Sequence, residues 1–209
     1  MFLALSGVIG RTQDQVQKSL TNYANSVNGG LQSADLITDD KNCCVIEESN
    51  NNTTIFYPYD YLEWDKSSEF ISRELSAPVF SFHIHDGDLW MYILYVNGQI
   101  VDQFNPIPDY WDENMSDTEI ESWKGDASVV AKHIGQAPTK INMYLTRWDP
   151  DAEGNEKAYN DDEFANEDWQ LLDFLRRCGL PYPLDEDGKA KGQIYKLWTK
   201  ELPLTISPT

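Results

Sequence analysis

The stretch of sequence that decides the fold is VFSFHIHDGDLWMYILYVNGQIVDQF, residues 79–104. It contains three strand-favouring runs separated by Asp86-Gly87 and Asn97-Gly98, the dipeptides most favoured in the two-residue type I′ turns of β-hairpins. The pattern therefore predicts an antiparallel three-stranded meander with strands at residues 79–85, 88–96 and 99–104.

Two-residue turns also determine which side chains share a face of the sheet, because one residue of slippage moves every side chain to the other face. The first turn is expected to place His85 opposite Asp88 and His83 opposite Trp90. Across the second turn, Leu94 is expected to face Val101, and Trp90 to face Asn105. The core face is then predicted to carry Phe80, Phe82, Ile84, Leu89, Met91 and Ile93.

The residues before the meander predict a ferredoxin-like core. The chain reads as a strand at 2–9, a helix at 12–27, a hairpin with strands at 43–48 and 53–59, a helix at 66–76 and the strand at 79–85. Thr12 and Gln15 have the spacing of a capping box, and Gly29 and Gly30 end the first helix. The order βαββαβ is that of ferredoxin-like folds, in which both helices lie on one sheet face.

The residues after Phe104 predict a mostly helical elaboration packed on this sheet. We expect a proline-containing arm at 105–111, helices beginning near Ser116, Asp126 and Asp168, a strand at 141–148, and a further strand around Ile194 to Leu197. No long linker divides the chain. We therefore predict an α+β fold in one domain, 1–209, with a sheet core at 1–105 and the elaboration at 106–209.

The charge of the chain excludes some classes of partner. Among 209 residues there are 35 Asp and Glu against 16 Lys and Arg, a formal net charge of −19, whereas the 41% hydrophobic content is sufficient for a folded core. Such a protein repels phosphate backbones and anionic lipid headgroups, so neither nucleic acid nor a membrane surface is an expected partner. A basic partner is favoured.

Localisation follows from the cysteines and the first residues. Cys43, Cys44 and Cys178 do not form a disulfide framework, and the apolar run at 1–10 is short and carries no preceding basic residue. No stretch reaches the roughly 18 apolar residues of a membrane helix. These features predict a reduced, cytoplasmic protein.

His83, His85 and Asp88 form the most distinctive cluster of candidate metal ligands. Alternation along a strand sends both imidazoles to one face, where a His-x-His pair can bind a divalent metal, with Asp88 as a third ligand or a supporting group. The alternative is structural: Asp86-Gly87 is a turn, His85 and Asp88 form an exposed pair, and His83 packs on Trp90. The sequence leaves both open and otherwise predicts no cofactor.

A second acidic segment resembles part of a calcium-binding loop. Asp149, Asp151 and Glu153 before Gly154 match the start of an EF-hand loop, but Asn160 stands where a bidentate Glu is required. The alternative is a solvated acidic loop. No G-x-S-x-G turn occurs, and only Lys41 lies near Cys43 and Cys44 in sequence, so nucleophilic catalysis is poorly supported.

Two segments concentrate the negative charge. Residues 109–126 hold seven acids and one lysine, and residues 149–168 hold nine acids and one lysine. Aromatic residues beside acids suit a protein interface. The candidate partner-binding residues are Tyr110, Trp111, Asp149, Asp151, Glu153, Asp161, Asp162 and Glu163.

The favoured hypothesis is a non-enzymatic protein-binding module whose acidic, aromatic surface recognises a basic protein, as inhibitors and immunity proteins do. Two alternatives stay open: a metal-dependent enzyme centred on His83 and His85, and a structural subunit of a larger assembly. The oligomeric state is not predicted.

Overall fold

The computed structural model describes residues 2–37, 42–59, 61–85, 87–149 and 156–204, which hold eight strands and five α-helices. The strands are β1 (Phe2–Val8), β2 (Gly30–Ala34), β3 (Cys43–Ser49), β4 (Asn52–Phe56), β5 (Pro78–His85), β6 (Leu89–Val96), β7 (Gln99–Phe104) and β8 (Gln193–Trp198). The helices are α1 (Gln13–Ser26), α2 (Trp64–Leu75), α3 (Asp117–Ser122), α4 (Ala127–Ile134) and α5 (Gln170–Cys178), with a 3-10 turn, η1, at Pro138–Lys140.

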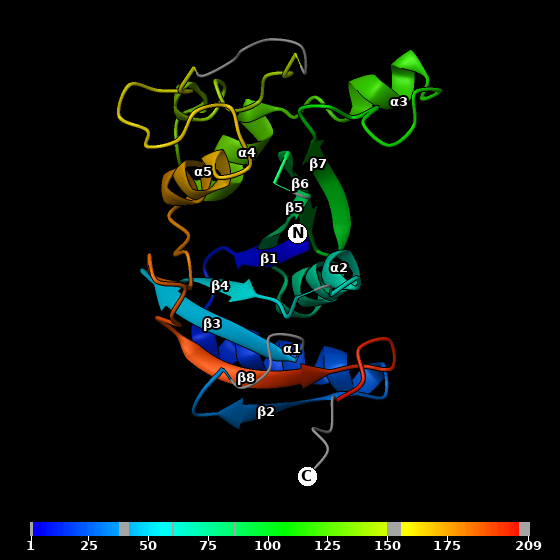
Figure 1. The fold of residues 1–209 in the computed structure, drawn as a ribbon, viewed down its shortest axis with the longest axis vertical. Helices are drawn as coiled ribbons and strands as arrows, with labels where there is room; N and C mark the ends of the chain where they lie inside the picture. Colours follow the sequence, from blue (N-terminus) through cyan, green and yellow to red (C-terminus); the bar gives the residue numbers. More distant parts are fainter. Residues whose placement is uncertain (1, 38–41, 60, 86, 150–155, 205–209) are drawn as a thin grey trace.

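All eight strands form one antiparallel sheet in the order β2-β8-β3-β4-β1-β5-β6-β7 (Figure 1). The fold is therefore mixed α and β. Strand β8, from the second half of the chain, lies between β2 and β3 and so joins the sheet of the first half. Within the described ranges, no helix is both long and apolar enough to cross a membrane.

Three of the predicted helix starts are confirmed by their capping contacts. Gln15 accepts a hydrogen bond from the backbone N–H of Thr12 at 3.1 Å, and Glu119 accepts one from the backbone N–H of Ser116 at 3.0 Å. Asp126 accepts from two N–H groups in the first turn of α4. These local contacts satisfy N–H groups that a helix start leaves without partners.

The second turn of the meander is confirmed, whereas the first differs from the prediction. Val96 pairs with Gln99, which leaves a two-residue turn. His85, however, pairs with Leu89 and not with Asp88, so three residues connect β5 and β6. The added loop residue changes the register by one position, and the predicted pairing of His83 with Trp90 is wrong because Met91 lies opposite His83.

The core face of β6 is consequently the reverse of the one predicted. Trp90, Tyr92 and Leu94 share a face with Phe80, Phe82 and Ile84, whereas Leu89, Met91 and Ile93 lie on the face of His83. Both faces of this sheet are covered, so β6 is apolar on both sides and alternation in its sequence does not distinguish them.

The pairing of β6 with β7 differs from the prediction because β6 contains a β-bulge. The register shifts between Leu94 and Tyr95, so that Leu94 pairs with Asp102 and not with Val101. The ladder ends at the pair of Tyr92 with Phe104, and the expected pair of Trp90 with Asn105 does not form. The bulge places Asp102 opposite Leu94. The Asp102 carboxylate accepts a hydrogen bond from the buried Tyr92 hydroxyl at 2.6 Å.

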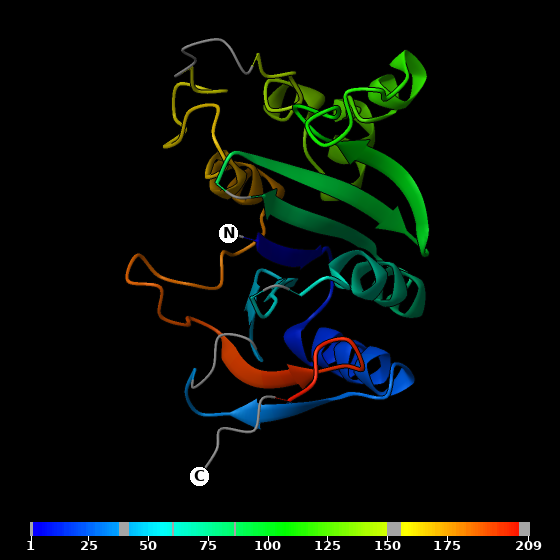
Figure 2. The ribbon, with the colours of Figure 1, turned by 45° about the vertical axis from the view of Figure 1, so that its right-hand side comes forward.

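Two cores lie on the two faces of the sheet. Helices α1 and α2 cover one face, whereas α4, α5 and the chain that follows α5 cover the other (Figure 2). Phe174 of α5 is fully buried at the centre of the second core. Because both faces of the sheet are covered, its strands contain few exposed apolar residues.

The predicted strand at 141–148 is wrong, and a strand was missed at β2. Residues 141–145 form consecutive turns in which Ile141 and Tyr144 are buried and Met143 is exposed. Their three-residue spacing matches helical turns better than the strand alternation read from the sequence. β2 follows Gly29, in a polar segment whose pairing with β8 is not evident locally.

Candidate functional site

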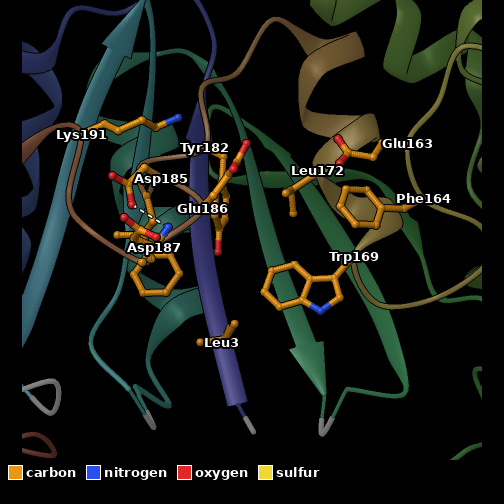
Figure 3. A pocket seen from close by; sticks show the side chains of 13 residues that line it. Leu3, Glu163, Phe164, Trp169, Leu172, Tyr182, Asp185, Glu186, Asp187 and Lys191 are labelled. Carbon is orange, nitrogen blue, oxygen red and sulfur yellow. Dashed lines mark hydrogen bonds between the residues drawn. The ribbon is translucent and has the colours of Figure 1, made fainter.

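A groove of about 910 Å³ lies on the sheet face opposite α1 and α2. Leu3 of β1 and Phe56 of β4 line its floor, while residues 163–172 and 182–191 supply the rest of its lining. In Figure 3 these two segments lie on either side of β1, with Leu3 between them. The volume lies within the range of about 300–1,000 Å³ that is common for ligand pockets.

The first wall is fixed by a carboxylate of α5. Asp173 Oδ2 accepts hydrogen bonds from the backbone N–H groups of Glu163 and Phe164, both at 2.8 Å. Asp173 is itself buried and bound to Arg176 at 2.7 Å. This arrangement holds the segment before α5 and leaves the Glu163 side chain exposed at the rim.

The second wall is a tight hairpin-like turn. Leu184 pairs with Ala190, and Asp185 Oδ1 accepts from the backbone N–H groups of Asp187 and Lys189 at 3.0 and 2.8 Å. Gly188 has a φ of +73°, which few side chains adopt without strain. The turn therefore projects three consecutive acidic residues, Asp185 to Asp187, at the rim of the groove.

A smaller cavity of about 230 Å³ adjoins the groove. Leu3, Phe56, Leu184 and Gly188 line both spaces. The remaining lining residues of the smaller cavity are Ile37, Cys43, Val45 and Tyr59. Among the described residues that line it there is no charged side chain, and most of them are apolar.

The lining of the groove is acidic and aromatic. It carries four acids, Glu163, Asp185, Glu186 and Asp187, against the single Lys191, together with Phe56, Phe164, Trp169 and Tyr182. Asp187 forms an exposed ion pair with Lys189 at 2.9 Å. Within the described part of the chain, the carboxylates of Glu163 and Glu186 form neither a hydrogen bond nor an ion pair.

Lys191 has an acidic neighbour outside the groove. Burial raises the pKa of Glu47 on β3, and the nearby Lys191 ammonium offsets part of that rise. The positive charge of Lys191 therefore compensates Glu47 in part, and the rim of the groove keeps an excess of negative charge.

Sequence reasoning identified one of these rim residues, Glu163, and missed the others. The signal that could have found the second wall is the run Asp185-Glu186-Asp187 before Gly188, an acidic turn after Pro181 and Pro183. That Trp169 and Tyr182 face one groove depends on how the chain leaves α5 and returns to the sheet, which no local pattern specifies.

The predicted metal-ligating residues lie at one end of β5 and β6. His83 is 6% exposed and its ring centroid lies 4.0 Å from that of Phe2 and 5.1 Å from that of Trp64. Its Nε2 has no hydrogen-bond partner among the described residues. The His83 and His85 ring centroids are 5.8 Å apart, and His83 does not pack on Trp90, which faces the other core.

Two predicted partner-binding residues, Tyr110 and Trp111, form hydrogen bonds with the predicted metal-ligating residues Asp88 and His85. The Trp111 indole N–H donates to His85 Nε2 at 3.2 Å, and the Tyr110 hydroxyl donates to Asp88 Oδ2 at 2.5 Å. The arm that carries them is thereby fastened to the β5–β6 turn. Within the described ranges, no group of three or more His, Cys, Asp or Glu side chains is arranged to hold a metal ion.

The described acids among the other predicted partner-binding residues differ in their surroundings. Asp162 is buried and Asp161 is exposed, and both pair with Arg177, at 2.9 and 2.6 Å. Asp149 is exposed. Asp151 and Glu153, and with them half of the suggested calcium-binding loop, lie outside the described residues.

The two acidic segments lie at one end of the molecule but on different sides of it. In Figures 1 and 2, α3 of the first segment projects to one side of the end remote from β2, and residues 156–165 lie on the other. The acidic surface favoured by sequence is therefore divided. The groove rim instead combines Glu163 with acids from a third segment, 185–187.

Burial of His83 has a consequence for stability at acidic pH. Desolvation, together with the nearby His85, lowers its pKa from 6.5 to about 4. The unfolded chain therefore binds a proton between these values that the folded chain does not, so stability falls as the pH falls. Lowering the pH from 7 to 5 is therefore expected to reduce the free energy of unfolding of the wild type by about 2 kcal/mol more than that of the His83→Gln variant. Urea unfolding at the two pH values measures this difference.

The control for this prediction is His133→Gln, since His133 is only half-buried on α4. Titrating groups other than the substituted histidine contribute equally to the pH dependence of all three proteins, so their contributions cancel in the comparison. A pH dependence unchanged by His83→Gln would show that His83 binds its proton equally in the folded and unfolded states.

None of the protein-family models, curated protein sequences or solved structures compared with this chain matches it significantly.

Proposed function

We propose that this protein is a non-enzymatic binding module that recognises a basic segment of a partner protein in the groove between α5 and the 182–191 turn. The observation that carries the proposal is the pairing of an aromatic, apolar lining with an excess of acidic groups at the rim. Apolar surface supplies binding free energy, and the carboxylates favour cationic partners and exclude anionic ones.

The position of the charges favours a peptide segment over a small cation. Glu163 lies on one wall and Asp185 to Asp187 lie on the other, so cations bound to both rims are separated by the apolar floor. A chain with basic and apolar side chains satisfies both rims and the floor at once. Trp169 and Tyr182 add aromatic faces on which Lys or Arg side chains can pack.

A synthetic peptide tests this proposal directly. We expect a fluorescein-labelled peptide of alternating lysine and leucine to bind, and one of alternating glutamate and leucine not to bind. The double variant Glu163→Gln, Glu186→Gln is expected to weaken binding about tenfold, because it removes two carboxylates that have no internal partner. Fluorescence anisotropy at low and high salt measures both effects, since screening should weaken only the charged contribution.

The matched control is Glu113→Gln, Glu201→Gln, which removes the same charge from exposed positions outside the groove lining. Equal losses in the two double variants would indicate attraction to the net charge of the protein and would contradict a site in the groove. Binding of spermidine as tight as that of the lysine-leucine peptide would contradict recognition of a protein segment.

We further propose that β3, β4, β1 and β5 with α1 and α2 constitute a ferredoxin-like core, to which the remaining strands and the mostly helical C-terminal elaboration are added. The antiparallel order β3-β4-β1-β5 and the packing of both helices in one core support this assignment. A cytoplasmic location is proposed as well, supported by three free, buried thiols.

The two alternative functions receive less support. A metal-dependent enzyme at His83 and His85 would require further ligands, and the neighbours of these rings are Phe2, Trp64, Tyr110 and Trp111. A subunit of a larger assembly would require a large apolar patch, whereas the exposed Ile100 lies on β7 and the exposed Leu36 lies in the segment after β2.

A further inference from the structure

We propose that the partner segment carries one large, uncharged anchor side chain beside its basic residues, and that this side chain enters the smaller cavity next to the groove. The inference rests on the proposed function and specifies the chemistry of the partner. It arises from the different character of the two adjoining spaces, one with an acidic rim and the other with no charged side chain among its described lining residues.

The smaller cavity has the size and lining of a pocket for a single side chain. Its volume is about 230 Å³, too small for a chain segment, and Cys43 and Val45 of β3 form part of its wall. Tyr59 and Ile37, which are both 37% exposed, lie at its margin. Filling it would cover the apolar surface that these residues leave open to water.

We expect the anchor to be uncharged because the described residues that line the cavity carry no carboxylate to replace the hydration of a cation. A lysine head group placed among them would lose its water shell without gaining a carboxylate from these residues, a costly transfer. The acids of the groove lie outside the lining of the smaller cavity. The two spaces thus select different side chains: cations along the rim and an apolar or aromatic group in the cavity.

Shared lining residues connect the two spaces in one site. Leu3, Phe56 and Leu184 contribute to both, so a segment lying on the groove floor passes the entrance of the cavity. Aromatic side chains that fill a desolvated pocket are common hot spots of protein interfaces. A partner segment that carries only lysines would contact the acidic rim and would leave the smaller cavity empty.

Two peptides test the inference with the wild-type protein. Both are labelled peptides of lysine and alanine, and one carries a single central tryptophan where the other has alanine. We expect the tryptophan peptide to bind at least tenfold more tightly. The Val45→Phe variant, which fills the cavity, should bind the tryptophan peptide no more tightly than the alanine peptide, whereas Val101→Phe, on the exposed face of β7, should retain the difference.

The possible results separate this inference from the proposed function. Equal affinities of the two peptides, still reduced by Glu163→Gln, Glu186→Gln, would overturn the anchor and leave the acidic groove as a binding site. No binding of either peptide or of the lysine-leucine peptide would overturn both. Because Val45 is buried, Leu184→Trp replaces Val45→Phe if thermal melting shows that the latter is unfolded. A tryptophan preference unaltered by whichever folded variant blocks the cavity would place the anchor elsewhere and overturn the inference.

Discussion

Replacing Arg177 by methionine is expected to lower the free energy of unfolding by about 3–5 kcal/mol, the usual effect of removing one partner from a buried ion pair. The Asp162 side chain is 0% exposed, and Arg177, itself 13% exposed, donates to it at 2.9 Å. The Tyr144 hydroxyl donates to the same oxygen at 2.7 Å. Without Arg177, this carboxylate keeps its desolvation cost and loses its closest cation.

The matched control is Arg73→Met, because Arg73 pairs with Glu69 at 3.0 Å while both side chains are exposed, by 60% and 42%. A partly solvated guanidinium is screened, so we expect a loss of about 1 kcal/mol or less. Urea unfolding followed by circular dichroism measures both variants. Equal losses would show that exposure does not set the strength of these ion pairs, and a loss below about 1 kcal/mol for Arg177→Met would contradict the role given to Asp162.

This ion-pair network also bears on the test of function. Two of the acids that the sequence singles out for partner binding, Asp161 and Asp162, are bound to Arg177 within the protein. Reversing their charge would disturb folding and would not report on a partner. Glu163, the next residue, is the one whose carboxylate points to the groove rim without an internal partner. Neighbouring acids in one run therefore have different roles.

The sequence predicted best those features that depend on a few adjacent residues. The capping boxes at Thr12 and Ser116 and the turn at Asn97-Gly98 each require a local hydrogen-bonding pattern or backbone conformation that these residues favour. Such signals located most helices and the meander. They carry no information about which face of a strand will be covered.

The errors arose where a distant segment determines the local structure. β2 forms a strand because β8, about 160 residues later, pairs with it, and His85 pairs with Leu89, one residue later than a turn at Asp86-Gly87 predicts. The groove shows the same dependence, since its walls come from residues 163–172 and 182–191 and its floor from β1 and β4. Composition indicated a basic partner, but the place where acids and aromatic residues meet required the tertiary structure.

The second large effect on stability is expected from Phe174→Ala, which should lower the free energy of unfolding by about 3–5 kcal/mol. Phe174 is fully buried on α5, and five aromatic side chains surround it. Their ring centroids lie 5.0 to 6.1 Å from its own, and they belong to Phe80, Phe82, Trp90, Tyr92 and Tyr144. Truncation leaves a cavity that these large rings cannot close.

Phe164→Ala is the control, because Phe164 is only half-buried on the groove wall and its loss should cost about 1 kcal/mol or less. Chemical unfolding followed by both near- and far-ultraviolet circular dichroism distinguishes two results. A single transition at lower urea means that α5 and the sheet unfold together, as one core requires. An early near-ultraviolet transition that leaves the sheet folded would contradict that cooperativity. Since α5 carries Trp169 and Leu172 into the groove, such a separate transition would also mean that the binding site can be lost while the sheet remains intact.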